Sequence, residues 1–289
     1  MSRWQVLSCL VAAAAGAVLS VTIGGQQLTF SAATRLVRVD VLVTEQGRPV
    51  GGLTAADFEI FDNGVKQSVS VVAIDSEPLD VVLALDMSRS ISADALETLR
   101  RSARSAVGAL QPADHVGVVA LGRVTDLRSP LTRDRQQVFT ALDAPPSFGE
   151  TALIDAVQGA LVMSAAGSGR PLIIVFTDGE DTASFLTADS VLTTAGGQAA
   201  VVYGVTTNTA PVGSFLRDIA TQTGGRLLPL RSIRDVERSL IDVFSEFRRR
   251  YVVGYQPTGV DGAGWHKLEV RVRRRGAEVT ARPGYFAPR

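Results

Sequence analysis

The middle of the chain alternates continuous apolar runs with segments of helical periodicity. From Asp80 onward, short apolar stretches suited to strands buried on both faces are separated by segments whose apolar residues recur every three or four positions. This alternation predicts an α/β domain with a doubly wound, mostly parallel sheet and flanking helices. The expected strands are 81–85, 115–121, 172–177, 199–205 and 226–229. The expected helices are one that starts after Ser92 and others at 133–142, 151–166, 187–196, 212–223 and 232–249.

The two flanks of this region are patterned as strands. Residues 36–44 alternate apolar and polar side chains, and short strands are expected near 58–61 and 69–74, which suggests a β meander. Strand patterning returns at 251–255 and 268–272. Because neither flank can bury much apolar surface alone, we predict that they pair into one smaller β domain. The predicted organisation is 1–33, 34–77, 78–248 and 249–289, with the α/β domain inserted between the two parts of the β domain.

The first 33 residues resemble an export signal. Arg3 supplies a positive charge, Val6–Val21 is almost entirely apolar, and Ser31–Ala33 offers small residues for cleavage. We therefore expect a periplasmic, cell-surface or extracellular protein, with an uncleaved membrane anchor as the alternative. The only cysteine, Cys9, lies in this segment, so a processed chain would contain no disulfide and no thiolate site.

Composition and charge exclude several function classes. The chain is 46% hydrophobic and 20% charged, which is typical of a globular protein. Its 29 basic and 29 acidic side chains cancel, so no overall field recruits nucleic acid or an anionic membrane. No glycine-rich nucleotide-binding loop is present. A partner must therefore be recognised by a local site.

Three segments place oxygen-bearing side chains at predicted strand ends or helix starts. Asp86, Ser88 and Ser90 follow the first strand of the α/β domain, Thr151 precedes a helix, and Asp178 follows the strand at 172–177. Ligands of open α/β sheets bind at this edge, beyond the carboxyl ends of the strands. We expect these five side chains to converge on one point.

Two carboxylates and three hydroxyls form an all-oxygen donor set. Such a set favours a hard cation, Mg²⁺ first, with Mn²⁺ or Ca²⁺ as alternatives, over zinc or copper. If the neutral hydroxyls bind the ion directly while the two aspartates act through water, the cation stays electrophilic. An Asp or Glu carboxylate of a partner protein would then bind strongly.

These residues resemble the metal-ion-dependent adhesion site of the von Willebrand factor A family, which uses Asp-x-Ser-x-Ser, a threonine and a later aspartate. The match is Asp86, Ser88, Ser90, Thr151 and Asp178, and the resemblance covers about residues 78–246. It implies a Rossmann-like fold and a non-enzymatic protein-binding role of the adhesion type.

Segments outside the domain and one position inside it refine this resemblance. Residues 52–58 and 284–286 look like those of exported bacterial proteins called VWFA-related domain proteins. One departure is Glu150, where family members often have glycine; this carboxylate either alters the site or points to solvent.

Two other functions are compatible with the sequence. The chain could be a structural assembly protein of the cell envelope without a functional metal, or a metal-assisted hydrolase, although His115 and His266 look like ordinary packed or surface residues. Asp155 could orient a metal-bound group or be a surface carboxylate. The arginine runs 248–250 and 273–275 are best explained by a helix end and a solvated strand face.

Overall fold

The computed structural model describes residues 36–73, 77–88, 91–146, 149–178, 180–207, 213–260 and 262–287. Residues Arg35–Arg289 form one compact unit. The predicted signal or anchor at 1–33, with Cys9, lies outside the described residues, and so does Ser90. Within the described ranges, no helix is long and apolar enough to cross a membrane.

A six-stranded sheet forms the centre of the α/β domain, in the order β11-β10-β9-β6-β7-β8. The pairs among the first five strands are parallel, and β8 runs antiparallel to β7 at the edge. The strands are β6 (Leu79–Asp86), β7 (His115–Leu121), β8 (Asp126–Thr132), β9 (Arg170–Thr177), β10 (Val201–Thr207) and β11 (Leu227–Leu230). The predicted fold class is thereby confirmed.

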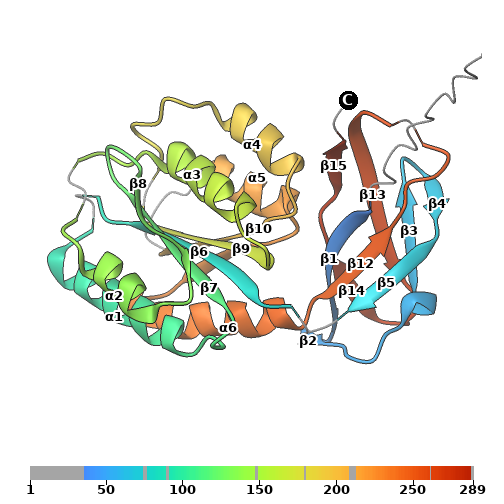
Figure 1. Cartoon of the computed structure of the whole chain (residues 1–289), viewed down its shortest axis with the longest axis horizontal. Coiled ribbons are helices and arrows are strands. Elements are labelled where there is room, and N and C mark those ends of the chain that lie inside the picture. The colour runs from blue at the N-terminus through green and yellow to red at the C-terminus, as the bar shows by residue number, and fades with distance from the viewer. Residues whose placement is uncertain are drawn as a thin grey trace, which may run out of the picture. The chain divides into compact units, whose positions relative to one another are not determined.

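Helices cover both faces of this sheet, with α1, α2 and α6 on one side and α3, α4 and α5 on the other (Figure 1). Their bounds are α1 (Ala93–Gly108), α2 (Arg135–Asp143), α3 (Leu153–Ala165), α4 (Ala188–Gly196), α5 (Ser214–Gln222) and α6 (Val236–Arg248), with a 3₁₀ turn η2 (Ile233–Asp235). The expected Ser92 cap is present, because its hydroxyl accepts a hydrogen bond from the Ala95 amide at 3.3 Å.

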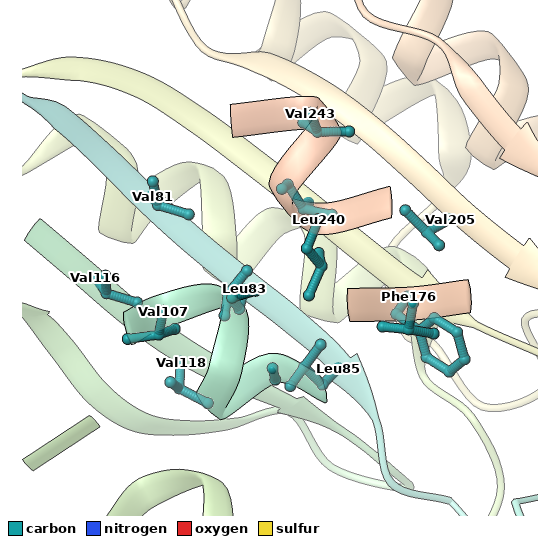
Figure 2. Close-up of a cluster of buried hydrophobic side chains, with 14 of the residues drawn as sticks. Val81, Leu83, Leu85, Val107, Val116, Val118, Phe176, Val205, Leu240 and Val243 are labelled. Atoms are coloured by element: carbon teal, nitrogen blue, oxygen red, sulfur yellow. The ribbon is translucent and has the colours of Figure 1, made fainter. Parts of the chain in front are cut away.

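Strand β6 shows why a continuous apolar run folds at the centre of the sheet. All eight of its residues are buried. Val81, Leu83 and Leu85 point into the core under α1 and α6, and Val82 and Ala84 point into the core under α3. Figure 2 shows the first of these cores, in which side chains from the sheet meet those of two helices.

The edge strand β8 was not among the expected strands. Its sequence, Asp-Leu-Arg-Ser-Pro-Leu-Thr, contains a proline and mixes polar with apolar residues. Such a mixture is compatible with its position, because only one of its seven residues is buried. Proline is tolerated at an edge, where its missing donor faces no neighbouring strand. Burial on one side only therefore removed the apolar signal that identified the other five strands.

Two antiparallel sheets make up the β part of the molecule. One has the order β14-β1-β12-β5 with β2 paired to β1, and the other has the order β15-β13-β3-β4. The strands are β1 (Val37–Glu45), β2 (Arg48–Pro49), β3 (Phe58–Asp62), β4 (Val65–Gln67), β5 (Val69–Ala73), β12 (Tyr251–Tyr255), β13 (Gly264–Val272), β14 (Ala277–Thr280) and β15 (Gly284–Ala287), with a 3₁₀ turn η1 (Ala55–Asp57).

The expected β meander is wrong. β1 lies between β12 and β14, both from the C-terminal tail, and β3 lies between β4 and β13. The first two long strands of the flank therefore belong to different sheets. The reason is burial: Val39 and Val41 of β1 and Ile60 of β3 are fully buried in one core, which requires the two sheets to face each other.

The arginine run 248–250 marks the end of α6, as expected, since Arg248 is the last residue of the helix and Arg249 is its C-cap. Arg250 is fully buried, donates to the Gly224 carbonyl at 2.7 Å and to the Tyr203 hydroxyl at 2.7 Å, and lies over the Tyr203 ring. Arg248 is bound to the buried carboxylate of Asp114. Both side chains connect the last helix to the sheet and its loops.

Candidate metal site at the edge of the parallel sheet

The carboxyl ends of β6 and β9 bring two aspartates to one place. The strands are parallel neighbours, with Leu85 opposite Phe176, so Asp86 ends β6 beside the end of β9, which Asp178 directly follows. The two carboxylates are close enough to interact, because the Asp178 charge adds to the burial that raises the pKa of Asp86. Two of the three predicted segments therefore meet as expected from their positions in the sheet.

Asp86 is fully buried and its carboxylate is held from both sides. The Ser88 amide donates to Oδ1 at 2.9 Å, and the Thr177 hydroxyl donates to Oδ2 at 2.7 Å. Burial raises the pKa of Asp86, hydrogen bonds from Ser88 and Thr177 oppose this effect, and the Asp178 charge adds to it. The carboxylate is thus fixed in position but left without a compensating positive charge among the groups that act on it.

Thr151 lies in the loop before α3, two residues ahead of the helix that was expected to include it. It is buried, its amide donates to the Thr182 hydroxyl at 3.0 Å, and its carbonyl accepts from the Thr182 amide at 2.9 Å. The next residue, Ala152, donates to the Gly122 carbonyl after β7 at 2.9 Å. Backbone contacts with two loops therefore place Thr151 at the same edge as Asp86.

Gly149 makes the turn into this loop. Its φ is +122°, a backbone conformation that residues with a Cβ rarely adopt. A Cβ added at this position would also lie only 2.9 Å from the Cβ of Arg123. The neighbouring Glu150 is exposed. Of the two interpretations of Glu150, solvation is the one that its exposure supports.

Asp155 anchors the loop after β9, a role that neither sequence interpretation included. Its two carboxylate oxygens accept hydrogen bonds from the amides of Phe185 at 3.0 Å and Leu186 at 2.9 Å. Asp181 in turn accepts from the Ile154 amide at 3.2 Å. This loop is therefore tied to the first turn of α3, beside Thr151.

Among the predicted ligands, Asp86, Ser88, Thr151 and Asp178 are described at this edge, and Ser90 lies outside the described residues. The described residues contain no group of three or more His, Cys, Asp or Glu side chains suited to a metal. A set of two carboxylates and several hydroxyls would not form such a group. The sequence interpretation placed Thr177 in the same segment as Asp178 but gave it no role, and its hydrogen bond to Asp86 was not expected.

Comparison with known proteins identifies the domain type. Residues 81–180 match the family model of the von Willebrand factor type A domain. No curated protein matches the sequence.

Solved structures share the fold at low sequence identity. A von Willebrand factor type A protein from Catenulispora acidiphila has a TM-score of 0.54 and 13% identity, with 90% of this chain and 76% of that chain covered. Proximal thread matrix protein 1 from the mussel byssus has a TM-score of 0.53 and 16% identity, covering 72% of this chain and 50% of that chain. A second structure of the mussel protein, with a zinc-occupied MIDAS motif (metal-ion-dependent adhesion site), has a TM-score of 0.54 and 18% identity. It covers 64% of this chain and 49% of that chain. This chain thus aligns with about half the length of the mussel protein.

Proposed function

Because the region spanning residues 81–180 belongs to the von Willebrand factor type A family, we propose that the chain is an exported, non-enzymatic binding module that holds one divalent cation. The cation is Mg²⁺, bound by Asp86, Ser88, Ser90, Thr151 and Asp178. Its partner is a protein that presents an Asp or Glu carboxylate. The observation that carries the proposal is the buried Asp86 carboxylate beside Asp178 at the carboxyl ends of β6 and β9.

The described residues fit a divalent cation. Two carboxylates close enough for one to raise the pKa of the other repel each other, and a cation beside them would remove that repulsion. The hydrogen bonds to Asp86 and the backbone contacts of Thr151 hold these groups in place before any ion arrives. Such positioning reduces the ordering that binding requires.

An all-oxygen donor set with neutral hydroxyls supports Mg²⁺ as the ion. The cation would supply an electrophilic position for an incoming carboxylate, and this chain's residues would hold and orient it. The zinc-occupied motif of the mussel protein supports a divalent ion at this kind of site.

The placement of the histidines supports a binding role over hydrolysis. His115 is bonded to the buried Asp80 at 2.7 Å, and His266 to the buried Asp62 at 2.7 Å, both outside the edge that carries Asp86. Neither is therefore placed to act as a general base for a water at that edge. Export is supported by the apolar N-terminal segment of the sequence.

Water proton relaxation of the Mn²⁺-loaded protein tests whether the bound cation can accept a carboxylate from a partner. We expect Mn²⁺ bound to the full chain to enhance water proton relaxation, because bound water completes its shell. Adding the blocked peptide acetyl-Gly-Asp-Gly-amide should lower the enhancement, since its carboxylate displaces that water. The matched peptide acetyl-Gly-Asn-Gly-amide should leave it unchanged.

The Asp178→Asn variant provides the protein control, and its relaxation enhancement should be lost. Equal effects of the two peptides would contradict carboxylate recognition. An enhancement that Asp178→Asn retains in full would contradict the assigned ligands.

A further inference from the structure

A cavity of about 340 Å³ lies at the opposite edge of the parallel sheet, where β10 begins. The turn between α4 and β10 forms one wall, through Gln198 and Ala199, and the β sheets form the others. Its apolar lining includes Leu36, Val37, Pro257, Val260 and Phe286. Cavities of this size and lining are typical of small-molecule sites.

The cavity wall contains a buried imidazole with one nitrogen unused. His266 is 2% exposed, and its Nδ1 lies 2.7 Å from a carboxylate oxygen of Asp62. Asp62 also accepts hydrogen bonds from the hydroxyls of Tyr255 at 2.8 Å and Tyr285 at 3.0 Å. Burial raises the pKa of both tyrosines, that of Tyr285 to about 12, so both hydroxyls stay protonated and donate.

These contacts fix the orientation of the ring. Since Asp62 is an acceptor, the Nδ1 of His266 carries a hydrogen and donates it. The other ring nitrogen, Nε2, is buried and has no hydrogen-bond partner within the described part of the chain. A buried polar atom without a partner is destabilising, which indicates that something else satisfies it.

The same wall contains a buried cation, Arg282, which is 8% exposed. Its guanidinium donates to three carbonyl oxygens, those of Gly284 at 2.8 Å, Gln198 at 2.6 Å and Gly196 at 2.7 Å. It forms no ion pair with any described residue, and the carboxylate that acts on it from farther away, Asp40, is bound to Arg170. Burial lowers the pKa of Arg282 to about 10.

Three of the five N–H donors of Arg282 are used, so two are left for a ligand. A buried cation is costly unless an anion compensates it. A carboxyl group has the matching chemistry for the two polar residues that line this cavity, since it offers one oxygen to Arg282 and one to Nε2 of His266. The apolar lining is suited to the rest of such a molecule.

We propose that this cavity binds an amphipathic monocarboxylate, with its carboxyl group on Arg282 and His266 and its apolar body against Val37, Val260 and Phe286. This site is separate from the metal site, because it lies where β10 begins and not at the ends of β6 and β9. Binding therefore does not require a divalent cation.

Calorimetric titration of the full chain with octanoate in the presence of EDTA tests the proposal, with 1-octanol as the uncharged ligand of equal length. Octanoate should bind saturably and at least about tenfold more tightly than octanol, because only the carboxylate compensates Arg282. Absence of octanoate binding, or equal affinity for both ligands, would overturn the proposal.

The His266→Asn variant retains a donor toward Asp62 but removes the Nε2 position, so octanoate should bind about tenfold more weakly. His115→Asn is the matched control, since His115 has the same kind of bond to a buried aspartate but does not line the cavity. Unchanged affinity in a folded His266→Asn variant contradicts the proposed contact.

If circular dichroism shows that His266→Asn does not fold, the Ala199→Phe variant tests the proposal instead. Ala199 is exposed and lines the cavity, so this substitution is compatible with folding. The larger side chain should block octanoate. Full binding by this variant would overturn the proposal.

Discussion

Replacing Arg170 by alanine is expected to lower the free energy of unfolding by about 3–5 kcal/mol, as for other buried ion pairs that lose one partner. Arg170 at the start of β9 is 2% exposed and is bound to Asp40 of β1. Its Nη2 also donates to the Phe247 carbonyl at 3.2 Å, and its guanidinium lies over the Phe247 ring. The variant leaves the Asp40 carboxylate almost buried without its cation. Urea unfolding of the purified variant measures the loss.

Two further variants separate this explanation from a general effect of removing arginine. Arg226→Ala should cost less than about 1 kcal/mol, since the Arg226 side chain is 53% exposed in its pair with Glu246. The double variant Arg170→Met with Asp40→Leu should recover most of the loss, because neither charge of the pair remains. A double variant as unstable as Arg170→Ala would show that the ion pair is not the cause.

Replacing Leu83 by alanine is expected to cost about 2–5 kcal/mol through the cavity that remains. Leu83 is fully buried at the middle of β6, in one cluster with Val107, Val118 and Leu240 (Figure 2). These neighbours belong to a helix, a neighbouring strand and a second helix, so the site cannot close without moving several elements.

Leu127→Ala is the matched control for Leu83→Ala. Leu127 lies on the edge strand β8 and is 55% exposed, so its loss should change the free energy of unfolding by less than about 0.5 kcal/mol. Thermal or urea unfolding of both variants gives the comparison. Equal losses would contradict the placement of Leu83 at the centre of the core.

Burial on two faces determined how much of the fold could be predicted from sequence. β6 and β9 are continuous apolar runs because helices cover both of their faces, and they were predicted to within two residues at each end. β8 is covered on one face and was missed. The pairing of β1 with β12 and β14 also could not be predicted strand by strand, because apolar alternation shows which face is buried but not which strand is adjacent.

The candidate metal site was easier to predict than the polar groups of the cavity where β10 begins. Asp86 and Asp178 each follow an apolar strand directly, so their meeting follows from parallel pairing. Asp62 and His266 are 204 positions apart, and neither has a local pattern that points to the other. Arg250 is similar, since its sequence position suggests a helix end while its partners Gly224 and Tyr203 come from distant segments.

Calorimetric titration of the full chain with Mg²⁺ tests the central claim most directly, beside the double variant Ser88→Ala with Ser90→Ala. Ser92→Ala, which removes only the cap of α1, is the matched control, and Zn²⁺ and Mn²⁺ titrations measure selectivity. We predict saturable one-to-one binding of Mg²⁺ that weakens at least about tenfold in the double variant and persists in the control, with the fold retained in both. Absence of saturable Mg²⁺ binding in the unmodified chain, or equal affinity in the double variant, would contradict the account.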